Sequence, residues 1–451
     1  MDIKQLYKLY QQHPTITTDS RNCPEGSIFL ALKGDKFDGN QFALQALSQG
    51  CAYAIVDDPS VGCAAAAPLQ ERLIPVDDCL QTFKLLAREH RRQFQIPVIG
   101  ITGTNGKTTT KELVAAVLGQ KYNVLFTQGN YNNDVGVPKT LMRLTPDHDI
   151  AVIEMGASHP GDIKTLAETA EPTCGLITNV GRAHLEGFGS FRNVVKTKGE
   201  LYDFLARRGE SLVFINVDNE RLMGILPDDV WVAPYSANPD NVEGCTCGEV
   251  ISCAPFLKFR WRESDTNLED RGEQPVWYEV QTQLIGSYNI DNMMAAIAVG
   301  LNFGVSPDDI NRALEAYKPS NNRSQLTVTE SNHLVVDAYN ANPSSMRAAL
   351  ENFRLMEVSP KLAILGEMRE LGKSSQKEHQ KIVDLLADAG LDEVWLVGDE
   401  YRQVSPPACP HRYFADVEAV KSAIAAAQPQ GRYILIKGSN STRLYELPAL
   451  L

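Results

Sequence analysis

Pro97-Val-Ile-Gly-Ile-Thr-Gly-Thr-Asn-Gly-Lys-Thr-Thr-Thr-Lys-Glu112 is the stretch that decides the fold. The apolar run from Val98 to Ile101 predicts a buried strand, a glycine-rich turn follows it, and the apolar residues after the turn recur at helical spacing. This order is typical of a phosphate-binding loop, in which backbone N–H groups and a helix N-terminus meet phosphate oxygens. Lys107 would then reach the terminal phosphates, and the hydroxyl group of Thr108 would bind Mg²⁺.

The match to the general phosphate-loop pattern is incomplete at one position. The pattern G-x-x-x-x-G-K-[ST] expects glycine at position 101, where this chain has Ile101. The glycines present are Gly100, Gly103 and Gly106. The alternative is an ordinary strand-to-helix turn that carries a lysine. We favour the phosphate loop because strand, turn and helix all fall where its mechanism needs them.

Composition limits the class of protein. The 451 residues are enough for about two to four domains with sizeable cores. A net charge of −13 argues against a general nucleic-acid binder. We find no signal peptide and no apolar run near the ~20 residues of a membrane span, so the expected location is the cytoplasm. The nine cysteines are scattered, and Cys245, Cys247 and Cys253 lack a recognisable zinc spacing.

The distribution of apolar runs predicts an α/β protein of three domains, with boundaries at 1–85, 86–318 and 319–451. Short strands mark the first domain. The second alternates strands and helices, which indicates a parallel sheet, and ends in two antiparallel strands joined by a long loop over 263–274. The third is a second αβ sheet. The main predicted strands are 27–32, 53–56, 98–101, 123–127, 150–154, 175–179, 212–217, 256–261, 276–284, 334–337, 362–365, 394–397 and 433–436.

Polar residues follow several of these strands, at the sheet edge where αβ proteins bind ligands. Glu154 ends one strand, and a carboxylate placed there can hold Mg²⁺ beside a phosphate loop, the alternative being a surface turn. His184 lies just past another strand end, and the residue alone leaves a ligand role and a structural role equally open. Asn289 and Asn292 open a helix, and helix capping is a serious alternative to a binding role.

Six motifs are spread over the central and last predicted domains. They are Thr102-Gly-Thr-Asn-Gly-Lys-Thr-Thr109, Gly129-Asn-Tyr-Asn-Asn-Asp-Val-Gly-Val-Pro138, Glu154-Met-Gly-Ala157, Asn179-Val-Gly-Arg-Ala-His-Leu-Glu-Gly-Phe-Gly189, Asp337-Ala-Tyr-Asn-Ala-Asn-Pro-Ser-Ser-Met346 and Leu365-Gly-Glu-Met-Arg-Glu-Leu-Gly372. Taken together they resemble the Mur ligases, and most closely the MurF type. With the first domain, the resemblance covers essentially the whole sequence. The Asn-rich stretch and the Tyr-Asn-Ala-Asn-Pro stretch point to the MurF type, while the phosphate loop is shared with folylpolyglutamate synthetases.

The resemblance implies a UDP-sugar-binding N-terminal domain, a central ATPase domain with a phosphate loop, and a C-terminal Rossmann-like lid. It implies an ATP-dependent ligase of peptidoglycan precursor synthesis that joins D-Ala-D-Ala to UDP-N-acetylmuramoyl-tripeptide through an acyl phosphate. A monomer is implied as well. The rivals are another amide ligase of the superfamily, such as a MurE-type or folylpolyglutamate ligase, and a non-catalytic ATP-binding regulator on this fold. An oxidoreductase is disfavoured because the glycine loop carries Lys-Thr rather than G-x-G-x-x-G.

The resemblance also assigns roles by position. Thr108 and Glu154 would bind one Mg²⁺, His184 would help to hold a second, and Lys198 would become a carbamate with CO₂ and serve as a metal ligand. With Lys107, the residues Glu154, His184 and Lys198 would be catalytic. ATP would contact Gly103, Thr104, Asn105, Gly106, Lys107, Thr108, Thr109, Asn289, Asn292, Arg323, Asp337, Tyr339 and Asn340. The UDP-sugar-peptide would contact Ser20, Arg21, Asp38, Gly39, Asn130, Asn132 and Asn133.

Two positions depart from the family pattern. Asn40 stands where histidine is frequent, and Asn440 stands where arginine is common after Lys-Gly-Ser. Both fall in expected binding regions, so they bear on substrate contacts and not on the type of reaction.

Overall fold

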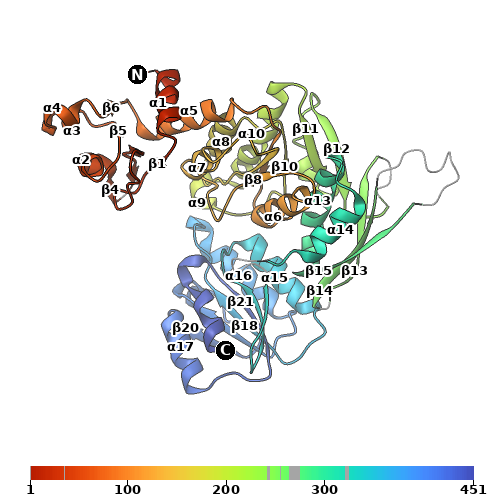
Figure 1. Cartoon of the computed structure of the whole chain (residues 1–451). Helices are drawn as coiled ribbons and strands as arrows, with labels where there is room; N and C mark the ends of the chain where they lie inside the picture. Colours follow the sequence, from red (N-terminus) through yellow and green to blue (C-terminus); the bar gives the residue numbers. More distant parts are fainter. Residues whose placement is uncertain (1, 35, 241–243, 254, 264–274, 320–324) are drawn as a thin grey trace. The chain divides into compact units, whose positions relative to one another are not determined.

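Figure 1 shows the computed structural model of the whole chain, which describes residues 2–34, 36–240, 244–253, 255–263, 275–319 and 325–451. The chain separates into two compact units. The first comprises residues 1–98, 125–155 and 165–172, and the second comprises 99–124, 156–164 and 173–451. The three-domain boundaries given above remain a prediction. The predicted loop over 263–274 and the predicted ATP contact at Arg323 lie outside the described residues, except for position 263 itself.

The first unit contains a small parallel sheet with strand order β1-β2-β5-β6. The apolar side chains of β2 and β5 are buried, as their short apolar runs predict. Asp2 begins the first helix with a capping box that engages Gln5, which satisfies backbone groups at that end. The elements are α1 (Ile3–Gln12), β1 (Ile16–Thr17), β2 (Ile28–Leu30), β3 (Lys33–Gly34), β4 (Phe37–Asp38), α2 (Ala43–Ser48), β5 (Tyr53–Val56), α3 (Pro59–Ala64), α4 (Ala67–Gln70), β6 (Leu73–Pro75) and α5 (Cys79–Arg91).

The remainder of the first unit carries β8 (Val124–Phe126), which begins at the unit boundary, α7 (Gly136–Leu141), β9 (Ile150–Glu154) and most of α8 (Asp162–Ala170). Strands β8 and β9 are neighbours in their sheet. His90 of α5 connects this part with the small sheet. Its Nδ1 atom lies 3.0 Å from the hydroxyl oxygen of Tyr7, and its Nε2 atom lies 3.0 Å from the carbonyl oxygen of Leu144.

The second unit contains consecutive strands in the order β15-β14-β13-β12-β11-β10-β7. Pairing is parallel from β7 to β13 and antiparallel from β13 to β15, so the predicted change of sheet type is confirmed. Strands β12 and β13 were not predicted from the sequence, and both carry exposed residues at one end. The strands are β7 (Val98–Thr102), β10 (Cys174–Ile177), β11 (Leu212–Asn216), β12 (Trp231–Ser236), β13 (Thr246–Cys253), β14 (Phe256–Arg262) and β15 (Tyr278–Ile285).

Helix α13 (Ile290–Asn302) lies between this sheet and α6 (Lys107–Leu118), and it is buried on nearly all sides. Gly300 allows the close approach of the two helices, because a Cβ atom there would lie 2.5 Å from a methyl carbon of Val117. The further helices of this part are α9 (Leu185–Phe188), α10 (Phe191–Arg208), α11 (Glu220–Met223) and α14 (Pro307–Ala316).

The C-terminal part of the second unit is a six-stranded sheet of order β16-β17-β21-β18-β19-β20. All neighbours are parallel except the edge pair β16–β17. The predicted strands are confirmed, and the short strands β16 and β20 were missed. Asn342 caps α15 and Pro343 is its first residue, as the sequence predicts. The elements are β16 (Gln325–Val328), β17 (His333–Asp337), α15 (Pro343–Leu355), β18 (Lys361–Gly366), α16 (Ser375–Leu386), β19 (Glu393–Val397), β20 (His411–Phe414), α17 (Val417–Ala426) and β21 (Tyr433–Lys437).

Among the helices that the structure describes, none has the length and apolar character needed to cross a membrane.

Candidate active site

The phosphate loop has the backbone conformation that its glycines permit. Gly103 and Gly106 have φ angles of 144° and 78°, which L-residues with a side chain rarely adopt. Gly106 begins α6, so the N-terminus of that helix opens at the loop. The ammonium group of Lys107 bends back over the turn and donates to the carbonyl oxygens of Gly103 at 2.9 Å and Thr104 at 3.0 Å. The loop therefore holds a cation and a helix N-terminus together, as anion binding requires.

A second segment, residues 178–181 after β10, is hydrogen-bonded to this loop. The backbone N–H of Asn105 donates to Oδ1 of Asn179 at 3.0 Å, and Nδ2 of Asn179 donates to the carbonyl oxygen of Asn105 at 3.0 Å. Oγ1 of Thr178 donates to the same carbonyl oxygen at 2.6 Å. A Cβ atom on Gly103 would lie 2.0 Å from Oγ1 of Thr178, so the close packing of the loop on Thr178 requires glycine at position 103. The sequence analysis quoted Asn179 within a motif but gave it no role.

The two asparagines predicted to contact adenine are buried and hydrogen-bonded to one another. Nδ2 of Asn292 donates to Oδ1 of Asn289 at 2.8 Å, and Nδ2 of Asn289 donates to the carbonyl oxygen of Ile285 at 2.8 Å. Oδ1 of Asn292 accepts from Oγ1 of Thr110 at 3.0 Å. Asn289 makes no side-chain capping bond to α13, so the capping alternative is wrong for this residue. The pair ties α13 to the phosphate-loop helix, and a contact with adenine remains a prediction.

His184 lies at the start of α9 in a left-handed conformation, with a φ angle of 49°. Its Nδ1 atom forms a short contact with Oε2 of Glu370, a residue that is also left-handed, with a φ angle of 61°. The backbone N–H of Glu186 donates to the carbonyl oxygen of Glu370 at 3.1 Å. The hydrogen bond from His184 holds the pKa of the Glu370 carboxyl below its usual value. Glu370 was quoted in a motif but was not assigned a role from the sequence.

Lys198 lies in the middle of α10 and is only 2% exposed. Its Nζ atom is 5.9 Å from the centre of the Phe188 ring. The same ring is edge-on to His184, with 6.4 Å between ring centres. The structure therefore brings His184 and Lys198 to one aromatic side chain. It does not place Lys198 on a solvated helix face, which is where a lysine of this type is usually found.

A cavity of about 430 Å³ is lined by His184 and by residues at the strand ends of the C-terminal part. Tyr339 and Asn340, both predicted to face the nucleotide, belong to its lining. Asp337 instead pairs with the buried Lys437, whose Nζ atom lies 2.8 Å from Oδ2 of Asp337. The remaining lining residues are Ala183, Ala341, Asn342, Arg369, Glu370, Ser439, Asn440 and Ser441.

One lining residue also reaches the phosphate loop. Nδ2 of Asn342, the residue that caps α15, donates to Oδ1 of Asn105 at 2.8 Å. Ser344, in the first turn of the same helix, accepts from the backbone N–H of Arg182 at 3.1 Å. The start of α15 is therefore hydrogen-bonded to the phosphate loop and to Arg182, which directly follows the segment 178–181.

In the first unit, Glu154 ends β9 and is 1% exposed. Its Oε1 atom accepts from Nδ2 of Asn132 at 2.7 Å, and its backbone N–H donates to Oγ1 of Thr127 at 3.0 Å. Asn133 accepts from the backbone N–H of Gly136 at 2.8 Å and so shapes the start of α7, whereas Asn130 is exposed. Asn132 thus orients the carboxylate of Glu154, a connection that the sequence did not predict.

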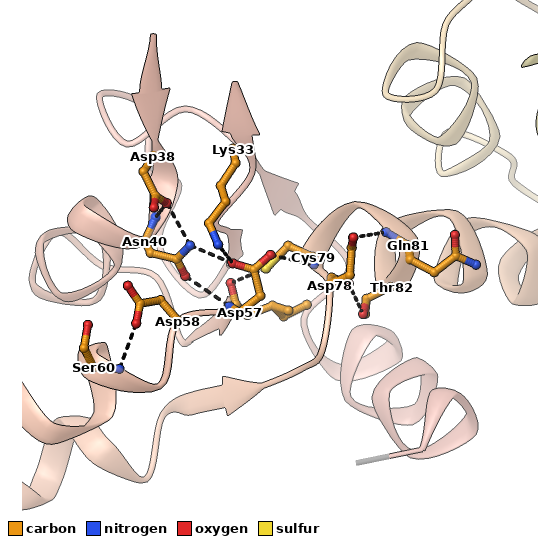
Figure 2. Close-up of polar contacts among 11 residues, drawn as sticks. Lys33, Asp38, Asn40, Asp57, Asp58, Ser60, Asp78, Cys79, Gln81 and Thr82 are labelled. Carbon is orange, nitrogen blue, oxygen red and sulfur yellow. Dashed lines mark hydrogen bonds and ion pairs between the residues drawn. The ribbon is translucent and has the colours of Figure 1, made fainter. Parts of the chain in front are cut away.

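The region of the first unit that is predicted to contact the UDP-sugar contains a buried asparagine, Asn40, with several polar contacts (Figure 2). Nδ2 of Asn40 donates to Oδ1 of Asp38 at 2.8 Å and to Oδ1 of Asp57 at 2.7 Å, and Oδ1 of Asn40 accepts from the backbone N–H of Asp57 at 3.1 Å. Lys33 pairs with Asp57 at 2.9 Å. Burial alone would raise the pKa of the Asp57 carboxyl, but hydrogen bonds from Lys33, Cys79 and Asn40 together hold it below its usual value.

Asn40 is one of the two departures from the family pattern. Both of its amide atoms are hydrogen-bonded within the fold, to Asp38 and Asp57. Gly39 packs so closely on the backbone that a Cβ atom would lie 2.6 Å from the carbonyl oxygen of Leu32. Arg21 is exposed and pairs with Asp19 at 2.9 Å, and Ser20 lies in the same turn.

The described residues contain no group of three or more His, Cys, Asp and Glu side chains that could hold a metal ion by themselves. Mg²⁺ in nucleotide enzymes is usually held by one or two protein groups together with phosphate oxygens. The hydroxyl of Thr108, in the second unit, and the carboxylate of Glu154, in the first, are each an oxygen donor of the kind that Mg²⁺ prefers.

Comparison with known proteins agrees with this description. Three family models match: a Mur ligase family catalytic domain over residues 14–91, a Mur ligase middle domain over 101–300, and a Mur ligase glutamate ligase domain over 322–440. The UDP-N-acetylmuramoyl-tripeptide–D-alanyl-D-alanine ligase of Escherichia coli K12 is 34% identical, over 96% of this chain and 92% of its own length.

Two solved structures share the fold along nearly the whole chain. MurF from Acinetobacter baumannii is 29% identical, with a TM-score of 0.85 over 99% of this chain and 97% of its own. MurF ligase from Thermotoga maritima, solved in complex with ADP, is 25% identical, with a TM-score of 0.83 over 97% of this chain and 96% of its own. The expected α/β fold and the resemblance are both confirmed: the chain belongs to the Mur ligase family.

Proposed function

We propose that this chain joins D-Ala-D-Ala to UDP-N-acetylmuramoyl-tripeptide with consumption of ATP, a step of peptidoglycan precursor synthesis. The observation that carries the proposal is the phosphate loop, with Lys107 and the start of α6 held in place by Thr178 and Asn179. The similarity to relatives of that activity over the whole chain supports the choice of substrates.

The chemistry follows from the need to activate a carboxylate, which is a poor electrophile. Transfer of the γ-phosphoryl group of ATP to the peptide carboxylate gives an acyl phosphate and ADP. The dipeptide amine then attacks the acyl carbon, phosphate leaves, and an amide bond remains. The ammonium group of Lys107 would offset the negative charge on the transferring group, which is where a fixed positive charge accelerates such a reaction.

Magnesium would neutralise phosphate charge during the transfer. We propose Thr108 and Glu154 as ligands for one ion, and His184 and Lys198 for a second. Glu154 is already oriented by Asn132, and Lys198 is buried beside Phe188, where conversion to a carbamate would replace a buried cation with oxygen ligands. Nδ1 of His184 is engaged by Glu370, so Nε2 would be the ring nitrogen that binds the ion.

The proposed nucleotide contacts are Gly103 to Thr109 for the phosphates, Asn289 and Asn292 for adenine, and Asp337, Tyr339 and Asn340 for the remainder of the nucleotide, with Arg323 at the phosphates. Support comes from the loop geometry and from the cavity that Tyr339 and Asn340 line. For the UDP-sugar-peptide we propose Ser20, Arg21, Asp38, Gly39, Asn130, Asn132 and Asn133. We further propose that the enzyme acts as a monomer in the cytoplasm and that residues 1–85, 86–318 and 319–451 are its functional domains.

The test is release of phosphate from Mg-ATP in the presence of UDP-N-acetylmuramoyl-tripeptide, with and without D-Ala-D-Ala. We expect release that depends on both substrates, together with a product heavier by the dipeptide. Release with a different amine would keep the ligase mechanism and reassign the acceptor. Binding of ATP without turnover for any amine would favour a regulator and contradict the proposal.

A further inference from the structure

The first unit contains two cysteines, Cys23 and Cys51, that are distant in sequence and close in space. Two backbone hydrogen bonds, of 2.8 Å and 2.7 Å, join residues 26–27 to residues 50–52. A Cβ atom on Gly50, the neighbour of Cys51, would lie 3.8 Å from the carbonyl oxygen of Cys23. The two segments that carry the thiols are therefore packed side by side, and the proposed reaction uses neither thiol.

The two thiols differ in their access to solvent. Cys51 is fully buried in the core of the first unit, whereas Cys23 packs against the same core and stays partly exposed. The hydroxyl oxygen of Ser27 lies 3.3 Å from Sγ of Cys51. Burial and the neighbouring Cys51 thiol raise the pKa of Cys23 to about 11, and the Asp19 carboxylate adds to this rise. A reagent from solvent therefore meets Cys23 first, and Cys51 is the thiol beside it.

The thiol of Cys23 also supports the turn that carries Ser20 and Arg21, two of the predicted UDP-sugar contacts. Cys23 donates to the carbonyl oxygen of Ser20 at 3.5 Å and to that of Asp19 at 4.0 Å. The carboxylate of Asp19 accepts from the backbone N–H of Arg21 at 3.0 Å. A sulfur atom in a disulfide has no proton to donate, so oxidation of Cys23 removes both of its contacts with the turn.

A disulfide suits this pair better than a bound metal ion. A structural zinc site needs four ligands, and the described residues contain no group of three or more His, Cys, Asp and Glu side chains that could hold an ion. A disulfide needs only two cysteines on adjacent backbone segments, which is the arrangement of Cys23 and Cys51. A reducing cytoplasm would keep the pair as thiols until an oxidant appears.

We propose that Cys23 and Cys51 form a reversible disulfide with a small disulfide oxidant, and that this disulfide weakens binding of the UDP-linked substrate. The thiolate of Cys23 attacks one sulfur of the oxidant, which gives a mixed disulfide and releases one thiol. The thiolate of Cys51 then attacks the sulfur of Cys23, and a second thiol leaves. Each released thiol carries one of the two protons that the cysteines lose. The effect on substrate binding rests on the proposed function, whereas formation of the disulfide does not.

The first measurement treats the whole protein with oxidised glutathione and maps its cysteines by mass spectrometry. We expect Cys23 linked to Cys51, with the pair lighter by two hydrogen atoms. Cys51→Ala should stop at the mixed disulfide between Cys23 and glutathione. Cys63→Ser is the matched control, because it removes an exposed thiol of the same unit and should leave the linkage unchanged. Between pH 7 and pH 9 the rate should rise about tenfold per pH unit, since the thiolate fraction of Cys23 does so below its pKa.

The second measurement titrates UDP-N-acetylmuramoyl-tripeptide into the reduced and the oxidised protein by calorimetry. Oxidation should lower the affinity by roughly 2- to 10-fold, the size of one lost hydrogen bond, and dithiothreitol should restore it. Cys23→Ser keeps a hydroxyl donor in the turn and cannot be oxidised, so its affinity should stay within about twofold of the reduced wild type with or without the oxidant. The affinity for ATP should not change, because the phosphate loop lies in the second unit.

Free thiols at Cys23 and Cys51, in a treated sample whose Cys63 has reacted, would overturn the proposal. A complete disulfide between Cys23 and Cys51 with unchanged affinity for the UDP-linked tripeptide would overturn its second half. Failure of the proposed function is distinguishable from both results. In that case the reduced wild type would not bind the UDP-linked tripeptide at all, while the mass spectrum would still decide whether the disulfide forms.

Discussion

The phosphate loop and the cavity lined by Arg369 lie in the same unit, but they differ in how far apart their residues are in the sequence. The loop is made by consecutive residues, and its partners Thr178 and Asn179 come from the next strand of the sheet. The cavity is assembled from four segments that are up to 258 positions apart, between Ala183 and Ser441. The loop is therefore set mainly by local sequence, whereas the cavity depends on how distant segments of the chain come together.

The comparison predicts that the largest functional loss arises in the loop. Lys107→Ala should lower turnover on the order of 10³-fold or more, because it removes the cation beside the transferring phosphoryl group. Its thermal unfolding should change little, since the carbonyl oxygens that Lys107 contacts belong to a turn that Thr178 and Asn179 also hold. Phosphate release and a melting curve on the same sample are the measurements. Wild-type turnover in the variant would refute the assigned role.

On the cavity side, the largest expected effect is on stability. Asp337→Ala leaves the ammonium group of Lys437 buried without its carboxylate, at a cost of about 3 kcal/mol. Denaturant unfolding measures this loss, and replacing Lys437 with Met as well should recover part of it. Asp399→Ala removes an exposed carboxylate near Arg402 and should cost about 1 kcal/mol or less. Equal losses in the two single variants would show that Asp337 does not support the fold in this way.

A smaller loss of stability is expected when the phosphate loop loses its hydrogen bonds to Asn179. Asn179→Ala deletes both side-chain hydrogen bonds to Asn105, for a loss of about 1–2 kcal/mol of stability. The KM for ATP should rise about tenfold because the loop is no longer held in shape, while the acceptor KM stays unchanged. Asn238→Ala, which removes a local turn contact to Asp240, should alter neither KM. An acceptor-specific effect of Asn179→Ala would contradict the assignment of Asn179 to the phosphate loop.

The smallest expected effect is on the pH dependence of stability, and it arises outside both the phosphate loop and the cavity. Burial lowers the pKa of His90 in the first unit below its ordinary value of 6.5, although the Leu144 carbonyl opposes the shift. The unfolded chain therefore binds a proton more readily than the folded one, so stability is kept above pH 6.5 and falls as pH decreases below it. Replacing His90 with Gln should flatten this decline in urea titrations at pH 7.5 and pH 5.5. A decline as steep as that of the wild type would show that His90 does not contribute.

The sequence was sufficient for the parts whose residues are neighbours. The strand, turn and helix around Lys107, the start of α15 at Asn342 and Pro343, and most strands of both large sheets follow from apolar spacing and end signals. The missed strands include β12, β13, β16 and β20, which are short or partly exposed and so lack a strong apolar pattern.

The contacts between distant residues could not be predicted. The support of Glu154 by Asn132, of Asn105 by Asn179 and of Arg369 by Glu367 depends on loop geometry that no residue spacing encodes. Glu370 likewise meets His184 only because two left-handed residues bring their loops together. The hydrogen bond between Asn289 and Asn292 was not predicted either, and their contact with adenine stays a prediction.

The most direct test of the central claim follows the oxygen atoms of the activated carboxylate. UDP-N-acetylmuramoyl-tripeptide labelled with ¹⁸O in its reacting carboxyl group is incubated with Mg-ATP and D-Ala-D-Ala, and the released phosphate is analysed by mass spectrometry. An acyl phosphate requires one labelled oxygen to leave with the phosphate, and this is the result we predict. Unlabelled phosphate alongside the ligated product would contradict the activation of the peptide by ATP.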